Sequence, residues 1–270
     1  MKRGLTAAGL ALIGMLSGLP ESAGSTQTQT LTIAAAQSLK PALREILSIF
    51  ESQYRQADVR VVYGPSQTLR QQIEDGAPAD VFLPASVEEV EALHKKGLTL
   101  NGSPQIYAQT SLVLATGSPA YAKAVFFENM HSQLVSRIAV GDPKTTSLGR
   151  LTDRLLSQLN LGPKPASRYL YRKHDEVIDL LNSGEADVGI VYRVDVAANP
   201  KLRIIDEVPG GIHIPVVFAE AVVWTCRHSS CELAREFTNF MHTPSVQKVL
   251  QKHGFDPVSS DAYQIEARRQ

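Results

Sequence analysis

Short apolar runs alternate with amphipathic stretches along most of the chain. Apolar runs at 31–36, 59–63 and 81–83 are separated by stretches at 40–54 and 67–74, in which apolar positions recur every three or four residues. Short apolar runs predict buried strands, and periodic stretches predict helices with one buried face. Strands that alternate with helices predict βαβ units and a mostly parallel sheet flanked by helices, an α/β fold.

A second series of the same kind follows. Its predicted elements are strands at 111–116, 138–140 and 188–192, helices at 149–159 and 176–182, and then a final strand at 219–224 with helices at 232–242 and 245–253. No repeat, low-complexity tract or long Pro/Gly/Ser-rich linker separates the two α/β halves. We therefore expect two lobes joined by strand-like crossovers that act as a hinge. The predicted first lobe comprises residues 25–108 and 218–270, and the second comprises 109–217.

The N-terminal segment has the pattern of a targeting sequence. Lys2 and Arg3 precede an apolar stretch at 5–19, and the small residues of 20–25 follow it. This stretch is shorter than the roughly 20 residues that span a bilayer, so residues 1–24 predict a cleaved signal peptide and a periplasmic protein. A retained N-terminal anchor is the alternative.

The overall charge and composition narrow the range of partners. Hydrophobic residues make up 43% of the chain, which is typical of a globular protein and excludes the disordered and collagenous classes. The 27 Lys and Arg residues balance the 27 Asp and Glu residues. A chain with no net charge has no broad positive field to bind a nucleic acid, so we expect no nucleic-acid partner.

The chain has two cysteines, Cys226 and Cys231, five residues apart. In an oxidising exported compartment this spacing favours a local disulfide, with free thiols as the alternative. A zinc site that also used His228 would need four ligands, and no second group of Cys or His with suitable spacing occurs in the sequence. We expect no metal site and no cofactor.

Sequence motifs of the common catalytic classes are absent. The chain has seven histidines but no HExxH pair, and it has no GxSxG elbow, P-loop or GxGxxG fingerprint. A catalytic histidine needs a positioned partner, which the sequence does not indicate. The sequence therefore predicts a protein that is not an enzyme.

Two serines begin predicted helices directly after predicted strands. Ser38 follows the strand at 31–36, and Ser66 follows the strand at 59–63. Open α/β sheets bind ligands at the carboxyl ends of their strands, and the free N–H groups and dipole of a helix amino terminus favour an anion. The two hydroxyls are thus candidates to bind one anion. The alternative is that both serines are simple N-caps.

The second half of the chain has comparable positions. The turn at 141–149 joins a strand to a helix, and the run at 174–177 opens another helix. Backbone N–H groups of Leu148 and Val177 are candidate donors to the same anion. Tyr192, at the end of a predicted strand, is a candidate hydroxyl donor, or else an amphipathic residue at the edge of a lobe.

Several of these segments together resemble the periplasmic molybdate-binding proteins of ABC importers. The segments are Ala34-Ala35-Ala36-Gln37-Ser38-Leu39, Gly64-Pro65-Ser66-Gln67-Thr68-Leu69, Gly76-Ala77-Pro78-Ala79-Asp80-Val81-Phe82, Val140-Gly141-Asp142-Pro143 and Gly189-Ile190-Val191-Tyr192. The resemblance implies a two-lobed periplasmic-binding-protein fold with the ligand in the interlobe cleft. It implies that a tetrahedral oxyanion, molybdate or tungstate, is held by Ser38, Ser66, Tyr192 and the amides of Leu148 and Val177. It also implies delivery to a membrane ABC permease, and we expect a monomer.

The chain departs from the family pattern at two places near this predicted site. It has Ser147-Leu148-Gly149 where the family often has Pro-Ala-Gly, and Pro65 removes an amide N–H beside the second serine. These departures leave the choice of anion open. Three alternatives remain: a binding protein for a different oxyanion, an exported hydrolase with Ser38 or Ser66 as nucleophile, and a sensor or interaction module.

Overall fold

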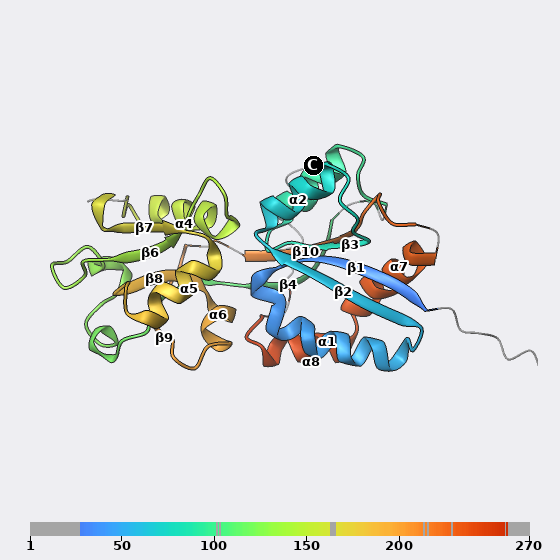
Figure 1. Ribbon diagram of the computed structural model, residues 1–270. Helices are drawn as coiled ribbons and strands as arrows, with labels where there is room; N and C mark the ends of the chain where they lie inside the picture. Colours follow the sequence, from blue (N-terminus) through green and yellow to red (C-terminus); the bar gives the residue numbers. More distant parts are fainter. Residues whose placement is uncertain are drawn as a thin grey trace, which may run out of the picture.

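Two five-stranded sheets with helices on their faces make up the molecule (Figure 1). The computed structural model describes residues 28–258 except 101, 103, 163–165, 213, 215, 228 and 257. The predicted signal peptide at 1–24 and the histidines His213 and His228 lie outside the described residues. No helix in the described part of the chain is both long and apolar enough to cross a membrane.

The first sheet is built from both ends of the chain. Its strand order is β2-β1-β3-β10-β4, with β1 at Gln29–Ala36, β2 at Ala57–Gly64, β3 at Val81–Leu83, β4 at Gln105–Thr110 and β10 at Val216–Val222. The second sheet comes from the middle of the chain. Its order is β7-β6-β8-β5-β9, with β5 at Leu112–Thr116, β6 at Ile138–Gly141, β7 at Tyr169–Arg172, β8 at Val188–Tyr192 and β9 at Arg203–Glu207.

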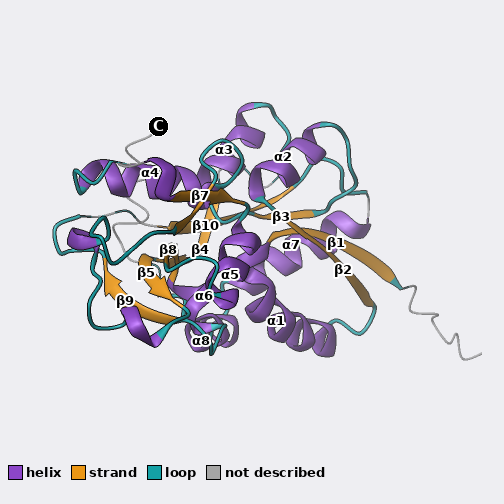
Figure 2. Cartoon of the chain, turned by 60° about the vertical axis from the view of Figure 1, so that its left-hand side comes forward, coloured by secondary structure: helices purple, strands orange, loops and turns teal. Residues whose placement is uncertain are grey.

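Helices cover both faces of each sheet, as Figure 2 shows from a second direction. The helices are α1 at Lys40–Gln53, α2 at Ser66–Glu74, α3 at Val87–Lys95, α4 at Ser147–Gln158, α5 at His174–Ser183, α6 at Arg193–Ala197, α7 at Ser229–Met241 and α8 at Pro244–Lys252. In the first lobe, Ile33 and Ala35 of β1 belong to the core formed with α1 and α7, whereas Ala34 belongs to the core formed with α2 and α3. This alternation is that of a strand buried on both faces.

Each sheet combines parallel and antiparallel pairs. The predicted parallel βαβ pairing is confirmed for β1 with β2 and β3, and for β6 with β7 and β8. The other pairs are antiparallel: β10 with β3 and β4, and β5 with β8 and β9. The antiparallel strands are those beside the crossovers, where the chain leaves one sheet and enters the other without an intervening helix.

The two lobes are connected twice. Only Ser111 separates β4 from β5, and residues 208–215 lie between β9 and β10. The predicted lobe boundaries at 108/109 and 217/218 fall inside β4 and β10. β4 continues for two residues after the first boundary, and β10 begins two residues before the second. Asp256, near the C-terminus, forms an isolated bridge with Gln109 beside the first crossover.

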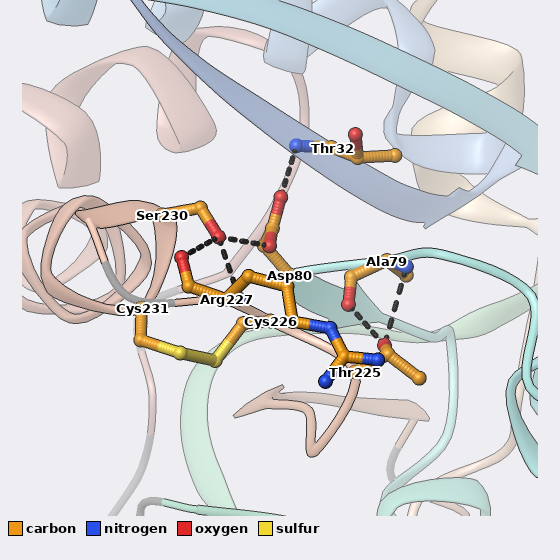
Figure 3. The surroundings of a disulfide bond; sticks show 8 residues. All are labelled: Thr32, Ala79, Asp80, Thr225, Cys226, Arg227, Ser230 and Cys231. Carbon is orange, nitrogen blue, oxygen red and sulfur yellow. Dashed lines mark hydrogen bonds between the residues drawn. A yellow bond between two sulfur atoms is a disulfide. The ribbon is translucent and has the colours of Figure 1, made fainter.

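The predicted disulfide joins Cys226 to Cys231 at the start of α7 (Figure 3). The loop that it closes is tied to β1 and β3 through Asp80. The carboxylate of Asp80 accepts hydrogen bonds from the amide of Thr32 at 2.7 Å and from the hydroxyl of Ser230 at 2.7 Å. Thr32 lies in the middle of β1. It is four residues before Ala36, the last residue of that strand, which corresponds to about 13 Å along the strand.

Replacing both cysteines by serine should lower the free energy of unfolding only modestly, by about 2 kcal/mol, because the closed loop is short. Denaturant unfolding of the two proteins measures the difference. The unmodified protein should show no thiol when it is denatured without reductant. Two reactive thiols in that assay would contradict the disulfide.

A buried carboxyl group, Glu220 of β10, lies under α7 and α8. The residue is fully buried, and its Oε1 lies 2.9 Å from Nε2 of His242. Burial raises the pKa of Glu220 to about 7, against the opposing effect of His242. The hydrogen bond to Glu220 raises the pKa of His242 in turn, against the effect of its own burial.

Glu220 should make the protein less stable as the pH rises from about 5 to 8. The folded state holds its proton more tightly than the unfolded state, whose carboxyl titrates near its ordinary value, so ionisation over this window favours unfolding. The raised pKa of His242 acts in the same direction. Glu220→Gln should remove most of this slope in denaturant unfolding. Glu45→Gln is the control, because the pKa of Glu45 is lowered and its titration lies below the window; equal slopes in the two variants would refute the assignment.

Candidate functional site

A cavity of about 190 Å³ lies between the two lobes, where strands of both sheets end. The residues around it lie at the carboxyl ends of β1, β2 and β8 or in the segments that follow β1, β2, β3, β6 and β7. They are Ala36, Gln37, Ser38, Tyr63, Gly64, Pro65, Ser66, Ala85, Thr146, Ser147, Leu148, Lys173, His174, Asp175 and Tyr192. Such a volume is below the roughly 300 Å³ at which sites for drug-sized molecules begin, so it suits a small ion.

The two predicted serines line this cavity together, and neither caps a helix. Ser38 lies inside a 3₁₀ turn, Gln37–Leu39, and Ser66 is the first residue of α2, whose N-cap is Pro65. No side-chain capping hydrogen bond is present at the starts of this turn, of α1 or of α2. The N-cap alternative is therefore wrong for both residues.

The hydroxyls of these serines are available to donate. Ser66 Oγ accepts a hydrogen bond from the amide of Ala85 at 3.0 Å, which fixes the oxygen and leaves its hydrogen for another acceptor. Ser38 is 8% exposed, and its Oγ has no hydrogen-bond partner within the described chain. Leaving a buried hydroxyl without a partner costs about 1–3 kcal/mol, so Ser38 is poised to bind an acceptor that the protein does not supply.

Tyr192 presents a second such hydroxyl from the other lobe. The residue ends β8 and is 2% exposed, and its Oη also has no hydrogen-bond partner among the described residues. Burial raises the pKa of Tyr192 well above its ordinary value, and the nearby charge of Asp195 adds to this. The phenol therefore stays protonated and acts as a donor at any physiological pH.

The amino terminus of α4 faces the cavity because two glycines let a strand and a helix meet. A side chain on Gly141 would place its Cβ 2.5 Å from the amide nitrogen of Gly149, and one on Gly149 would lie 2.4 Å from the backbone of Asp142. Thr146 is the N-cap, and its Oγ1 accepts the Gly149 amide at 2.9 Å. The amide of Leu148, one residue earlier, has no acceptor within the helix, as predicted for an anion donor.

The start of α5 corrects one predicted donor. The helix begins at His174, two residues before the predicted start, and its N-cap is Lys173. Val177 is therefore the first residue whose amide bonds within the helix: it donates to the Lys173 carbonyl at 3.0 Å, and Val177 does not line the cavity. The amides of His174 and Asp175 have no intrahelical acceptor, and both residues line the cavity. We assign the donor role predicted for Val177 to this first turn.

The side chain of His174 was not predicted to belong to the site. Its Nε2 lies 2.7 Å from Oδ2 of Asp195, which also accepts the amide of Tyr192 at 3.1 Å. Burial alone would lower the pKa of His174, but the charge and hydrogen bond of Asp195 outweigh this and raise it. The only sequence signal was a Lys-His-Asp run directly after a strand. The pairing with Asp195 across 21 residues had no signal.

The geometry does not support serine nucleophiles. A nucleophilic serine needs a base within hydrogen-bond reach. Ser38 has no partner in the described structure, and the recorded partner of Ser66 is a backbone amide. The histidine in the cavity wall, His174, is bonded to Asp195 instead. The arrangement can bind an anion but has no activated nucleophile among the described residues.

Comparison with known proteins identifies the family of the chain. The family model described as "Bacterial extracellular solute-binding protein" matches residues 31–256. A relative called "Molybdate-binding protein ModA" from Haemophilus influenzae is 28% identical over 229 residues, covering 83% of this chain and 89% of the relative.

Two solved structures show the same fold at low sequence identity. The periplasmic molybdate-binding protein of Azotobacter vinelandii superposes with a TM-score of 0.75 at 23% identity, covering 85% of this chain and 100% of that one. The sulfate-binding protein SubI of Mycobacterium tuberculosis superposes with a TM-score of 0.72 at 17% identity, covering 89% and 91%. These two likenesses concern the fold alone.

Substituting proline for His174 tests whether the backbone amide of this residue donates to the anion. Proline removes one amide hydrogen at the first helical position, where it is tolerated, and Lys173 already has the extended backbone, ψ 160°, that precedes proline. His174→Pro should bind a small oxyanion about tenfold or more weakly than His174→Ala, because one charge-assisted hydrogen bond is lost. Both variants lack the imidazole, so their ratio in calorimetric titration isolates the amide. Equal affinities would exclude this amide from the site.

Proposed function

The chain belongs to the family of bacterial extracellular solute-binding proteins, and from this premise we propose that it captures a tetrahedral oxyanion, molybdate or tungstate. The observation that carries the proposal is the pair of buried hydroxyls, Ser38 and Tyr192, that come from different lobes and lack any acceptor in the described chain. Both line the cavity that Ser66 and the amino termini of α4 and α5 also reach. The relative named for molybdate supports this choice of anion.

Neutral donors and helix termini are sufficient to hold such an anion. A hydrogen bond to a charged group contributes about 1.5–3 kcal/mol, so several of them together offset the cost of ordering the ligand. His174 Nε2 lies 2.7 Å from Oδ2 of Asp195, and the pair adds no net charge to the cavity wall when the imidazole is protonated, the form that Asp195 favours. Lys173 is exposed and places a cation at the rim.

The same wall discriminates between anions. The wall offers mainly neutral donors, so an anion that carries its own O–H group, such as hydrogen phosphate, is disfavoured because its hydrogen must take a hydroxyl oxygen or Asp175 as acceptor at the expense of a donor. The carboxylate of Asp175, the acidic residue in the wall, already accepts the amide of Glu176 at 3.1 Å. Sulfate is disfavoured by its smaller size, since it reaches fewer donors of a rigid cavity at once.

In the cell, the protein acts as the binding component of an importer. We propose that it is exported with cleavage of residues 1–24, works in the periplasm as a monomer, and presents its anion to a membrane ABC permease. It uses no resident metal ion or cofactor, and it catalyses no reaction. The anion is its cargo.

Calorimetric titration with molybdate, tungstate, sulfate and phosphate tests the proposal. Molybdate and tungstate should bind at least about a hundredfold more tightly than the other two, a difference of about 3 kcal/mol. Ser38→Ala should weaken molybdate binding by about 1.5–3 kcal/mol, because it removes one hydrogen bond to a charged acceptor.

Ser157→Ala is the matched control for this titration. Ser157 is exposed on α4, and its hydroxyl donates to the Asp153 carbonyl at 2.8 Å, away from the cavity. Its removal should leave the affinity unchanged. If sulfate or phosphate bound best, the anion would be reassigned. If none of the four bound, the oxyanion proposal would fail and the sensor or interaction alternative would take its place.

A further inference from the structure

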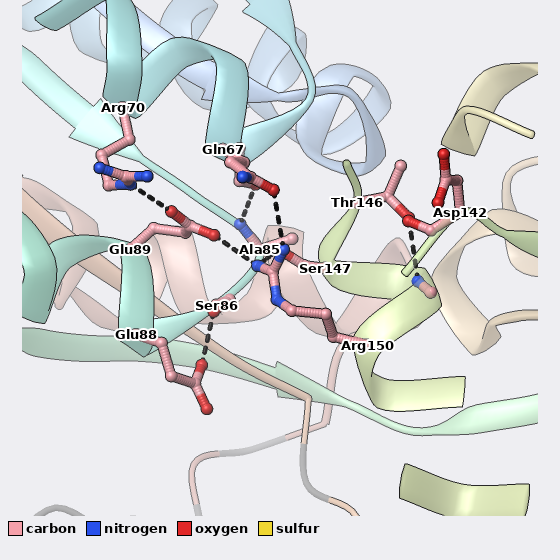
Figure 4. Close-up of polar contacts among 12 residues, drawn as sticks. Gln67, Arg70, Ala85, Ser86, Glu88, Glu89, Asp142, Thr146, Ser147 and Arg150 are labelled. Carbon is pink, nitrogen blue, oxygen red and sulfur yellow. Dashed lines mark hydrogen bonds and ion pairs between the residues drawn. The ribbon is translucent and has the colours of Figure 1, made fainter. Parts of the chain in front are cut away.

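The side chain of Arg150 joins the two lobes beside the cavity (Figure 4). Arg150 lies on α4 of the second lobe, and its Nη2 is paired with Oε1 of Glu89 on α3 of the first lobe. Its Nη1 donates to Oε1 of Gln67 on α2 at 3.1 Å. The guanidinium therefore binds two helices of the opposite lobe at once.

The side chain of Glu89 is also fixed by a partner within its own lobe. The residue is 5% exposed, and its other oxygen, Oε2, accepts a hydrogen bond from Nε of Arg70 at 2.7 Å. Arg70 is also paired with Glu74, which in turn lies 2.8 Å from Nζ of Lys96. When the lobes separate, Glu89 keeps a cationic partner and needs no rearrangement to receive Arg150 again.

The contact is coupled to the proposed anion site through sequence neighbours. Gln67 directly follows Ser66, and Arg150 lies two residues after Leu148. Nη2 of Arg150 also lies 3.2 Å from Oγ of Ser147 in the first turn of α4. Arg150 thus aligns the first turn of α2, which carries the Ser66 hydroxyl, with the first turn of α4, which carries the Leu148 amide.

We propose that Arg150 is a positioning residue, an interlobe latch that stabilises the closed arrangement without touching the anion. This inference rests on the proposed function, because it assigns part of the apparent anion affinity to a contact outside the cavity. The apparent affinity of a ligand scales with the fraction of protein in the binding-competent state. An ion pair formed only on closure raises that fraction and slows release of the anion.

The matched control is on the same helix. Arg154 lies four residues after Arg150, and its nearest contact with Glu88 of α3 is 4.0 Å between side chains that are 48% and 40% exposed. Exposed pairs of this kind contribute little. Arg154→Gln removes the same charge from the same pair of helices but leaves the latch in place.

The experiment compares Arg150→Gln, Glu89→Gln, the double variant and Arg154→Gln. Stopped-flow dissociation of molybdate should be about tenfold faster in Arg150→Gln than in the unmodified protein. In Arg154→Gln the rate should stay within about twofold of that of the unmodified protein. The effects of Arg150→Gln and Glu89→Gln should be non-additive in the double variant, because both substitutions remove the same ion pair. The radius of gyration of the molybdate-saturated protein should be the same in all variants, since the anion still closes the lobes.

A second measurement does not depend on molybdate. X-ray scattering of the anion-free proteins should show Arg150→Gln more open than both the unmodified protein and Arg154→Gln, with circular dichroism confirming that each is folded. The latch is refuted if Arg150→Gln matches Arg154→Gln in both dissociation rate and anion-free compactness. If the unmodified protein does not bind molybdate, the proposed function fails, and the latch stands or falls on the anion-free comparison alone.

Discussion

Burying a hydroxyl group without an acceptor destabilises a folded protein, and this protein does so twice around one cavity. Ser38 and Tyr192 reach the cavity from different lobes, and neither finds a partner among the described residues. An acceptor that lies between the lobes recovers this penalty. The amino termini of α4 and α5, both in the second lobe, line the same cavity and offer backbone amides there. An anion that accepts from both lobes stabilises the closed arrangement by its preference for closed over open.

The chain path explains how both lobes contribute to one site. The segment that leaves the first sheet as β4 enters the second as β5 across the single residue Ser111, and it returns through β10. Two crossovers of this kind allow rotation of one lobe against the other while keeping the strand ends aligned. Because both sheets turn the carboxyl ends of their parallel strands toward the crevice, the donors meet there without any long loop to carry them.

Two charged pairs lie around the site. Asp195 balances His174 inside the wall, and Glu89 receives Arg150 outside it. This separation divides two tasks. In the proposed mechanism, the neutral hydroxyls and amides select an anion by shape and by its lack of protons, whereas the ion pair between lobes sets how long the closed state lasts. A change of anion and a change of release rate therefore depend on different residues.

Local patterns in the sequence were sufficient to predict the α/β class, the two halves and the disulfide. They also singled out Ser38, Ser66, Leu148 and Tyr192, which line one cavity, because each lies where a strand meets the segment that follows it. The start of α5 was misplaced by two residues, since Lys173 is not a residue type that usually caps a helix, although Glu176 at the third helical position accepts the Lys173 amide. Three features had no sequence signal at all: the pair of His174 with Asp195, the burial of Glu220, and the contact of Arg150 with Glu89 across 61 residues. Each depends on which surfaces approach one another when the lobes assemble, and only the tertiary structure brings those surfaces together.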